Sequence, residues 1–407
     1  MKDKVGIVLA GIGGFGNNYV NSLLDYKGEE IFEIRGVVDP RPEGCRRVNE
    51  LKSRNIPFYN SIEQFYENGN RADLAVISSP IQFHCRQSCM ALSHGSHVLC
   101  EKPIAATLQE AKKMADERDR AGKILAIGFQ WSYSPAILAL KQDILNGLMG
   151  KPLRLKTMTL WPRDYKYYKR GWAAKIKDAS GNWVLDSIAN NATAHYLHNM
   201  FFILGDKVNT SLRPEKLEAE VYRANKIQNF DTAVIRAHSG NVKMLYIASH
   251  AVEDNFGPVF CYEFENAKVT YDENGTREIK ASFGDGTVKK YGDPTKDIMR
   301  KLSVVIDAIE KGSDFVPCSI EAATSQLLCI NAIQDAVHEE IPQFPKELTV
   351  EDKNLCGGGP GIYVRGISDL LKKCYEGWKM PSEYDVSWAK NTGMIDLRHY
   401  DNFIGWK

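Results

Sequence analysis

The sequence predicts an α/β protein in two main parts: a doubly wound parallel sheet, then an α+β domain with an open, mainly antiparallel sheet. Two observations carry this prediction. In the first ~128 residues, short apolar runs alternate with segments of helical spacing, which is typical of a parallel sheet covered on both faces. After about residue 150, segments of β character and turn signals such as Glu273-Asn274-Gly275 dominate.

Three ranges divide the 407 residues. We expect the parallel-sheet domain in residues 1–128 and the α+β domain in residues 129–340. Residues 341–407 form a C-terminal extension packed on the second domain. At roughly 150 residues per domain, this length suits two or three domains.

Regular elements are expected throughout the first two ranges. The strands of the first are Val5–Ala10, Phe32–Val38, Leu74–Ser78, Val98–Cys100 and Ile124–Ile127, and its helices Asn17–Leu24, His84–Leu92 and Leu108–Ala121. The strands of the second are Leu153–Leu160, Leu217–Arg223, Thr232–Ala237, Lys243–Ala248 and Val259–Phe264, and its helices Ala136–Asn146, Met299–Lys311 and Glu321–His338. The extension is expected to be irregular apart from a helix near Ile367–Tyr375.

Composition excludes several classes of protein. The chain is 43% hydrophobic and 25% charged, as in an ordinary globular protein. Its net charge of +1 gives no bulk attraction to nucleic acid or to a membrane, and no run approaches the ~20 apolar residues of a spanning helix. The nine cysteines are scattered without a C-x-x-C pair, so we expect free thiols in a reducing cytoplasm and no metal site.

A glycine-rich turn lies between the first predicted strand and the first helix. Gly11-Ile12-Gly13-Gly14-Phe15-Gly16 satisfies the pattern G-x-G-x-x-G. Its glycines allow a tight turn and a close approach of backbone to pyrophosphate, and the helix N-terminus offers N–H groups to the phosphates. This context predicts a Rossmann domain that binds a dinucleotide. A strand–helix turn without a nucleotide is the structural alternative.

Asp39 ends the second predicted strand, where a carboxylate can accept hydrogen bonds from both ribose hydroxyls. This position favours NAD, since a 2′-phosphate would meet a negative charge. Arg41 could pair with such a phosphate, so NADP stays possible, although a solvated loop charge is the simpler interpretation. The structural alternative for Asp39 is a turn-forming Asp-Pro pair.

Four later segments fit one family when they are taken together with this turn. They are Ser78-Ser79-Pro80-Ile81-Gln82-Phe83-His84, Glu101-Lys102-Pro103, Gly128-Phe129-Gln130-Trp131-Ser132-Tyr133-Ser134-Pro135, and the stretch from His195 to Gly205. In this order and spacing they resemble the T-P-x-x-x-H, E-K-P, G-F-N-R-R-F-x-P and D-x-G-x-H-x-x-D…L-G segments of the Gfo/Idh/MocA family. The resemblance covers roughly residues 5–340.

This resemblance implies a Rossmann domain, an α+β domain with an open sheet, and nicotinamide-dependent oxidation or reduction of sugars, polyols and related compounds. Hydride would pass between the nicotinamide and a secondary hydroxyl or ketone of a sugar, glycoside or cyclitol. The residues expected to contact the cofactor are Gly11, Gly13, Gly14, Phe15, Gly16, Asp39, Arg41, Ser79, Pro80, His84, Glu101, Lys102 and Gln130.

Two departures from the family pattern bear on the substrate more than on the cofactor. Asn191 stands four residues before His195, where the family usually has aspartate. Trp131 and Ser132 replace the arginines that frequently follow the phenylalanine.

Oxidation of a secondary alcohol needs a group that removes the hydroxyl proton as hydride leaves carbon. His195 is the first candidate, because imidazole titrates near neutrality. Lys102 is the second, since it can share a proton with the hydroxyl or donate a hydrogen bond to the developing carbonyl. Asn191 cannot ionise, so it is expected to hold the substrate or orient His195. The structural alternatives are a packed histidine and a surface lysine.

A sugar pocket needs flat apolar faces together with planar donors and acceptors. The residues expected to bind substrate are Trp131, Tyr133, Trp161, Arg163, Asn191 and His198. His198 lies about one helical turn beyond His195, and aromatic side chains of this kind more often belong to a core than to a ligand platform.

Two other functions fit the same motifs. One is NAD-assisted glycoside cleavage by transient oxidation and elimination, and the other is a non-catalytic NAD-binding regulator. The expected partner is a small sugar or polyol, with no nucleic acid and no membrane. We also expect a homodimer or homotetramer formed through the open sheet, because a partly apolar face would not stay bare.

Overall fold

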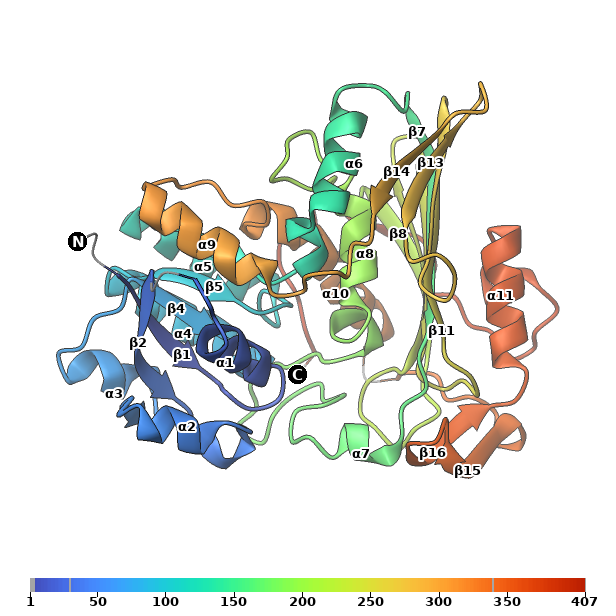
Figure 1. Cartoon of the computed structure of the whole chain (residues 1–407). Coiled ribbons are helices and arrows are strands. Elements are labelled where there is room, and N and C mark those ends of the chain that lie inside the picture. The colour runs from blue at the N-terminus through green and yellow to red at the C-terminus, as the bar shows by residue number, and fades with distance from the viewer. Residues whose placement is uncertain (1–3, 29–30, 339, 407) are drawn as a thin grey trace. The chain divides into compact units, whose positions relative to one another are not determined.

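The structure is a computed structural model that describes residues 4–28, 31–338 and 340–406 (Figure 1). The chain divides into two compact units. The first contains the described residues up to 105, residues 109–134 and residues 297–324. The second contains residues 106–108, residues 135–296 and the described residues from 325 onward. This division differs from the expected boundary near residue 128, because a later segment, residues 297–324, joins the first unit.

The first unit holds a six-stranded sheet in the order β3-β2-β1-β4-β5-β6, in which every pairing is parallel. The strands are β1 (Val5–Ala10), β2 (Phe32–Val38), β3 (Phe58–Tyr59), β4 (Leu74–Ile77), β5 (His97–Cys100) and β6 (Leu125–Ile127). The helices are α1 (Gly16–Leu24), α2 (Val48–Ser53), α3 (Ile62–Glu67), α4 (His84–Ser93), α5 (Leu108–Ala121) and α9 (Arg300–Lys311). The predicted doubly wound sheet is confirmed, and each expected strand and helix of the first range is present within one residue of its predicted ends.

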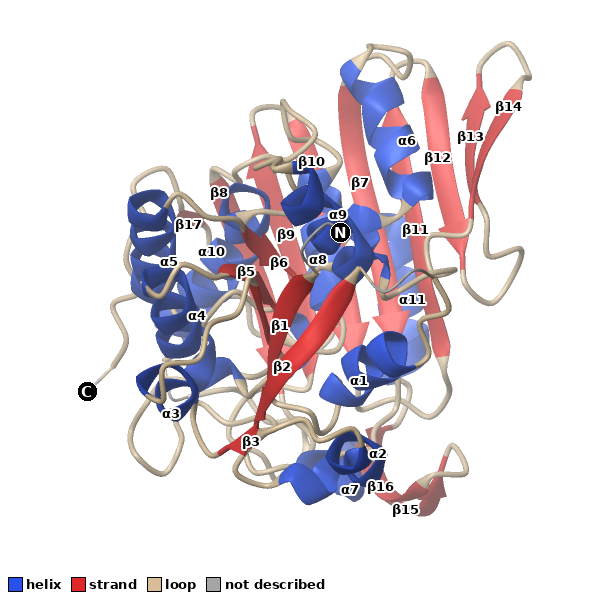
Figure 2. Cartoon of the chain, turned by 60° about the vertical axis from the view of Figure 1, so that its left-hand side comes forward, coloured by secondary structure: helices blue, strands red, loops and turns tan. Residues whose placement is uncertain are grey.

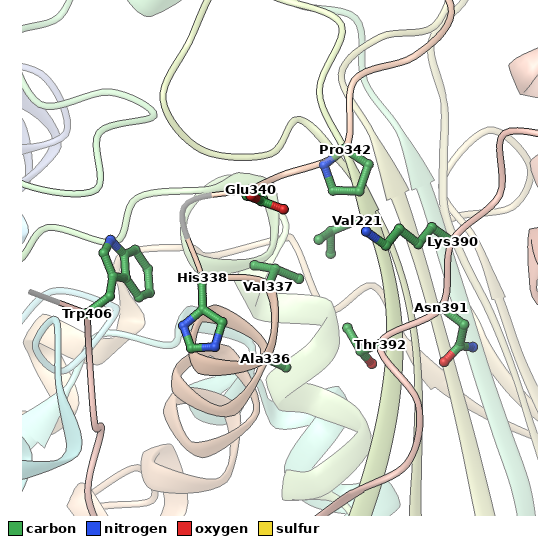
Figure 3. Close-up of a pocket in the computed structure, with 10 residues that line it drawn as sticks. All are labelled: Val221, Ala336, Val337, His338, Glu340, Pro342, Lys390, Asn391, Thr392 and Trp406. Atoms are coloured by element: carbon green, nitrogen blue, oxygen red, sulfur yellow. The ribbon is translucent and has the colours of Figure 1, made fainter.

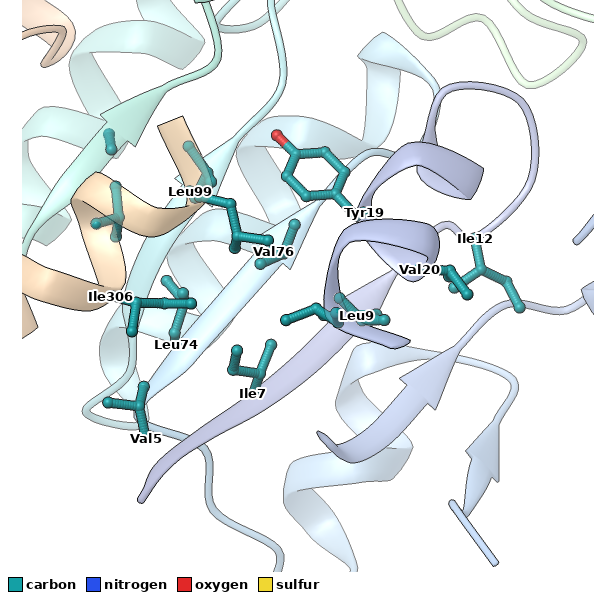
Figure 4. Close-up of a cluster of buried hydrophobic side chains, with 14 of the residues drawn as sticks. Val5, Ile7, Leu9, Ile12, Tyr19, Val20, Leu74, Val76, Leu99 and Ile306 are labelled. Carbon is teal, nitrogen blue, oxygen red and sulfur yellow. The ribbon is translucent and has the colours of Figure 1, made fainter. Parts of the chain in front are cut away.

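One buried cluster explains why α9 belongs to this unit. Ile7 and Leu9 of β1 and Val76 of β4 point into a core that α1 closes on one side (Figure 4). Val305 and Ile306 of α9 lie in the same cluster. The amphipathic pattern of residues 299–311 predicted this helix, but not which sheet it would cover.

The second unit holds a nine-stranded sheet in the order β14-β13-β12-β11-β7-β10-β9-β8-β17 (Figure 2). Its strands are β7 (Pro152–Leu160), β8 (Lys216–Tyr222), β9 (Thr232–Ser239), β10 (Val242–Ser249), β11 (Phe256–Phe264), β12 (Ala267–Asp272), β13 (Ile279–Phe283), β14 (Val288–Gly292) and β17 (Ile395–Asp396). Its helices are α6 (Pro135–Leu145), α7 (Tyr165–Tyr168), α8 (Ala194–Phe202), most of α10 (Ile320–Val337) and α11 (Ile367–Gly377). A hairpin of β15 (Thr349–Leu355) and β16 (Gly359–Val364) lies where the extension was expected to be irregular.

Only one pair of strands in this sheet is parallel, so the expected mainly antiparallel sheet is confirmed. That pair is β7 and β10, and Leu160 lies opposite Ser249. Parallel strands end at the same edge of a sheet, so the residues after β7 and β10 emerge side by side. We call Trp161, Pro162, Arg163 and His250 the carboxyl edge.

The two faces of the large sheet are covered by different parts of the chain. Helix α8 lies on one face, and α11 lies on the other, which we call the outer face (Figure 1). On the outer face, Leu245 and Ile247 of β10 form one buried cluster with Ile367 and Leu371 of α11. The buried carboxylate of Glu220 on β8 accepts a hydrogen bond from the Ser382 backbone N–H at 3.1 Å, which anchors the chain beyond α11.

A homo-oligomer formed through the open sheet was expected because an apolar sheet face would not stay exposed. In this structure the chain's own C-terminal segment covers the apolar part of the outer face, so that reason no longer applies. Charged side chains such as Arg154 and Glu263 continue the outer face beyond α11, and they pair with each other at 2.7 Å.

Replacing Leu371 tests how strongly α11 is held on the outer face. Leu371 is fully buried. We expect Leu371→Ala to lower the free energy of unfolding by about 2–5 kcal/mol, because it removes buried methyl groups and leaves a cavity. Denaturant unfolding of the full chain measures the change. Glu376→Ala, at an exposed position of the same helix, is the control. Equal effects of the two substitutions would contradict the packing described here.

Candidate functional site

The glycine turn of the first unit has the geometry of a phosphate cradle. A Cβ atom on Gly11, whose φ is +83°, would lie 2.7 Å from the Ser79 backbone nitrogen, and one on Gly16 would lie 2.2 Å from the Gly11 oxygen. A side chain at either position would clash with nearby backbone, so the fold itself requires these two glycines. Gly14 has a φ of +51° and no other atom within 4 Å of its Cβ position. Bare backbone beside open space at the start of α1 suits a pyrophosphate.

Asp39 is fixed beside this turn by both of its carboxylate oxygens. Oδ2 accepts a hydrogen bond from the Ile12 N–H at 2.9 Å, and Oδ1 accepts one from the Arg41 N–H at 2.8 Å. Each oxygen keeps a further lone pair that can accept from a ribose hydroxyl. The Arg41 side chain is exposed, and it makes no ion pair among the residues that the structure describes. The residues present thus fit a dinucleotide.

His84 links two loops instead of presenting a ring nitrogen to a ligand. It is 1% exposed, and its Nε2 lies 2.9 Å from the Ser79 oxygen. Its Nδ1 lies 2.8 Å from the Pro103 oxygen. Burial lowers the pKa of His84, and the two carbonyl contacts oppose that shift. The expected cofactor contact of His84 is therefore corrected to a positioning role for the loops after β4 and β5.

Glu101 is held in the interior by residues that the sequence did not single out. Lys301 of α9 forms an ion pair with Glu101 Oε1 and donates a hydrogen bond to the Gly128 oxygen at 3.1 Å. The hydroxyl of Tyr19 donates to the same Oε1 at 2.6 Å, while Oε2 accepts from the Lys102 N–H at 3.2 Å. Burial lowers the pKa of Lys301, and Glu101 counters that shift. Glu101 thus orients the backbone at Lys102, whose own side chain is partly exposed.

Two aromatic residues expected to bind substrate belong to the core of the first unit instead. They follow Gln130, which opens a short 3-10 helix (Gln130–Tyr133) and is itself partly exposed. Tyr133 is fully buried, and its hydroxyl lies 3.1 Å from the carbonyl oxygens of both Ile127 and Cys318. Trp131 is 2% exposed. Neither ring surface is open to a sugar in this structure.

In the second unit, His195 lies in the first turn of α8, directly after the loop that carries Asn191. Thr193 ends that loop, and its hydroxyl donates to the Ile188 oxygen at 2.6 Å. His195 is 8% exposed and Asn191 is partly exposed, so both are near the surface of the unit.

His198 is on the same helix but lies in its interior. It is fully buried and stacks on the Phe202 ring at a centroid distance of 5.5 Å. Burial, assisted by the nearby charge of Lys141, lowers the pKa of His198 to about 3. The expectation that His198 binds substrate is therefore corrected to a packing role, since the spacing from His195 did not decide which way the ring points.

The carboxyl edge approaches α8. The ring of Trp161 meets the ring of Tyr196, the residue after His195, edge to face at 5.7 Å. His250 lies 2% exposed beside it, and its Nδ1 is 2.7 Å from the Trp161 oxygen. Trp161, Arg163 and His195 thus belong to one region of the second unit. Sequence reasoning missed His250, because only the parallel pairing of β7 and β10 brings it to Trp161.

A separate pocket of about 630 Å³ lies elsewhere in the second unit. The side chains of His338 and Trp406 line one side of it, and Lys390 and Thr392 line the other (Figure 3). None of the residues predicted to act in the chemistry lines this pocket.

Searches for other kinds of site were negative within the described residues. They contain no group of three or more His, Cys, Asp or Glu side chains arranged to hold a metal ion. No helix there has both the length and the apolar character needed to cross a membrane.

Comparison with known proteins finds a matching family model for the N-terminal part of the chain. A family model described as "Oxidoreductase family, NAD-binding Rossmann fold" (GFO_IDH_MocA) matches residues 5–129. Over these residues the chain is similar to the Gfo/Idh/MocA family. Residues 5–129 are accordingly the family's NAD-binding Rossmann fold, and the glycine turn and Asp39 lie within them.

Named relatives of this family match parts of the chain. The D-glucoside 3-dehydrogenase of Escherichia coli strain K12 is 36% identical over 20% of this chain and 23% of its own length. The inositol 2-dehydrogenase/D-chiro-inositol 3-dehydrogenase of Lactiplantibacillus plantarum is 25% identical over 58% of this chain and 62% of its own. The chain thus spans less than two thirds of the curated relatives that it matches.

A solved structure shares the fold more widely. The WlbA dehydrogenase of Bordetella pertussis, in complex with NADH and UDP-GlcNAcA, aligns with a TM-score of 0.65 and 19% identity. The alignment covers 81% of this chain and 95% of that one. At this identity the likeness concerns the fold alone.

Removing the positive charge of Lys301 tests the ion pair behind this family's E-K-P segment. We expect Lys301→Met to lower the free energy of unfolding by about 3–5 kcal/mol, because it leaves the carboxylate of Glu101 buried without its partner. Denaturant unfolding measures the change. Lys311→Met on the same helix, where the side chain is 72% exposed, is the control. A loss no larger than that of the control would show that the pair contributes nothing.

The buried ring of His198 makes a prediction about pH. Because its pKa is about 3 in the folded chain and near 6.5 in an unfolded one, the unfolded state binds the extra proton between these values. The free energy of unfolding should therefore fall as pH drops from about 6.5 towards 3. We expect His198→Gln to reduce that pH slope by about one proton. Urea unfolding at several pH values measures it, and an unchanged slope in His198→Gln would contradict the lowered pKa.

Proposed function

We propose that this protein is an NAD-dependent oxidoreductase that transfers hydride between the nicotinamide and a secondary hydroxyl or ketone of a sugar, glycoside or cyclitol. The observation that carries the proposal is the first unit's combination of a glycine cradle, a fixed Asp39 and the Glu101-Lys102-Pro103 segment secured by Lys301. The names of the relatives, a glucoside dehydrogenase and an inositol dehydrogenase, support the substrate class.

NAD is proposed over NADP because of the charge at Asp39. Its carboxylate accepts two backbone hydrogen bonds, which fix its position at the end of β2. A ribose 2′-phosphate in reach of this carboxylate would be repelled, whereas a 2′-hydroxyl would donate to it. The exposed guanidinium of Arg41 is a nearby feature that favours the phosphate.

Within the proposed reaction, bound NAD supplies the acceptor for hydride. His195 takes the hydroxyl proton as the carbonyl forms, and Lys102 donates a hydrogen bond to the oxygen on which charge changes. Asn191 holds a substrate hydroxyl through its amide, since it carries no negative charge that could stabilise an imidazolium. Trp161 and Arg163 of the carboxyl edge contact the sugar.

We propose the cytoplasm as the place of action, because all nine cysteines are free thiols and such thiols persist in a reducing compartment. A homodimer or homotetramer stays a prediction for light scattering to test. Its interface would lie outside the part of the outer face that α11 covers.

Turnover of two variants tests the proposed chemistry. A panel of sugars, glycosides and cyclitols is first screened for NADH formation. With a substrate in hand, we expect Lys102→Met and His195→Ala each to lower kcat by about 10²–10⁴-fold, the contribution typical of a positioned acid or base. NAD binding, measured by calorimetry, should persist in both. Lys112→Met, with a side chain 74% exposed, is the control. Near-normal turnover in both variants would refute the assignment.

A further inference from the structure

We propose that the second unit binds an oxyanion, a carboxylate or phosphate carried by a hydroxylated substrate, in a hollow beside the carboxyl edge. The hollow has a volume of about 390 Å³ and lies between the segment from Pro162 to Arg170 and the β15–β16 hairpin. This inference rests on the proposed function for the reaction, and it narrows the substrate to a sugar acid or sugar phosphate.

The charges that line this hollow are unbalanced. Arg163, Lys166 and Arg170 line it, and none of the three makes an ion pair within the part of the chain that the structure describes. Asp164 is the carboxylate among the lining residues, and its Oδ1 accepts a hydrogen bond from the Tyr167 N–H at 3.0 Å as the N-cap of α7. Three cations thus share the hollow with one carboxylate that is already engaged. An anionic ligand would relieve the repulsion between them.

Two of the cations are held in fixed orientations by one aromatic ring. The guanidinium carbon of Arg170 lies 4.0 Å from the centroid of the Tyr167 ring, and that of Arg163 lies 5.1 Å from it. Arg163 donates one hydrogen bond to the Pro162 oxygen and Arg170 one to the Tyr167 oxygen, each at 3.0 Å. A guanidinium has five N–H donors, so most remain for an oxyanion. Stacking orders these planar forks before a ligand arrives, which suits two-point binding of carboxylate or phosphate.

His250 packs against the Tyr167 ring that orders the two guanidinium groups, and it is not one of the residues that line the hollow. Its Nδ1 faces a carbonyl oxygen, which can only accept, so Nδ1 carries the hydrogen and Nε2 presents a lone pair. Nε2 is buried and has no hydrogen-bond partner in the described chain. The ring packs against Tyr167 at 5.4 Å. Burial, together with Arg163 and then Arg170, lowers the pKa of His250 to about 3.

The ligand that fits Arg163, Lys166 and Arg170 is an anion. Under the proposed function the substrate also carries hydroxyl groups, so a sugar acid or a sugar phosphate meets both requirements. Unsubstituted sugars lack the anionic group.

Binding of three matched ligands tests the proposal. Calorimetry on the NAD-loaded full chain compares D-glucuronate, glucose 6-phosphate and D-glucose. We expect at least one of the two anions to bind at least ten times more tightly than glucose, and to weaken with added salt. Preference for glucuronate identifies a carboxylate site, and preference for glucose 6-phosphate identifies a phosphate site. Equal affinity for all three ligands would overturn the proposal.

Substitutions assign the binding to these residues. We expect Arg170→Gln and Lys166→Gln each to weaken the preferred anion, the former by about tenfold or more, while glucose binding is unchanged. Arg154→Gln is the matched control, because Arg154 stacks on Trp378 at 4.4 Å on the outer face of the same unit. Anion affinity that is insensitive to Arg170→Gln and Lys166→Gln would place the site elsewhere and refute the proposal.

The two proposals fail in different ways. If no member of the panel reduces NAD while glucuronate or glucose 6-phosphate still binds through Arg170, the proposed reaction is wrong and the oxyanion site stands. If a neutral sugar is oxidised and Arg170→Gln changes no affinity, the reaction stands and the oxyanion site is wrong.

Discussion

The ion pair between Lys301 and Glu101 is the interaction on which the cofactor-binding unit depends. It joins residues 200 positions apart, and both side chains are almost fully buried. A buried charge is tolerated only when it is paired and hydrogen-bonded. Here the remaining contacts come from the Tyr19 hydroxyl, the Gly128 carbonyl and the Lys102 N–H. The Glu101 carboxylate therefore connects α1, α9 and the residues that follow β5 and β6. It also fixes the backbone of Lys102.

The same pair shows what the sequence could and could not predict. The glycine turn and the strands around it were predictable because each is a local pattern: an apolar run, a turn residue, a helical period. Lys301 was not, because a lysine on an amphipathic helix has the pattern of a surface residue, and only the packing of α9 on β1 buries it. The two-residue strand Phe58–Tyr59 was not predicted for a different reason, since two residues are too few to show the alternating pattern of a strand.

The predicted substrate-binding residues also differ in how well a local pattern could place them. Trp161 and Arg163 follow β7 at the carboxyl edge. This position was predictable, because both residues come directly after a segment with the alternating pattern of a strand. Tyr133 and His198 were wrong because a motif or a helical spacing gives a residue's place along the chain but not the direction of its side chain. The position of His250 could not be predicted, because only the pairing of β10 with β7, some ninety residues apart, brings it beside Trp161.

The C-terminal segment on the outer face has a consequence for how the chain is made. Residues from Ile367 to Met380 are synthesised after the strands that they cover, because they lie further along the chain. Until that segment emerges, Val234, Leu245 and Ile247 belong to an apolar surface with nothing packed against it. The nascent chain thus carries an exposed apolar sheet surface that the folded protein does not, and synthesis of this later segment allows that surface to be covered.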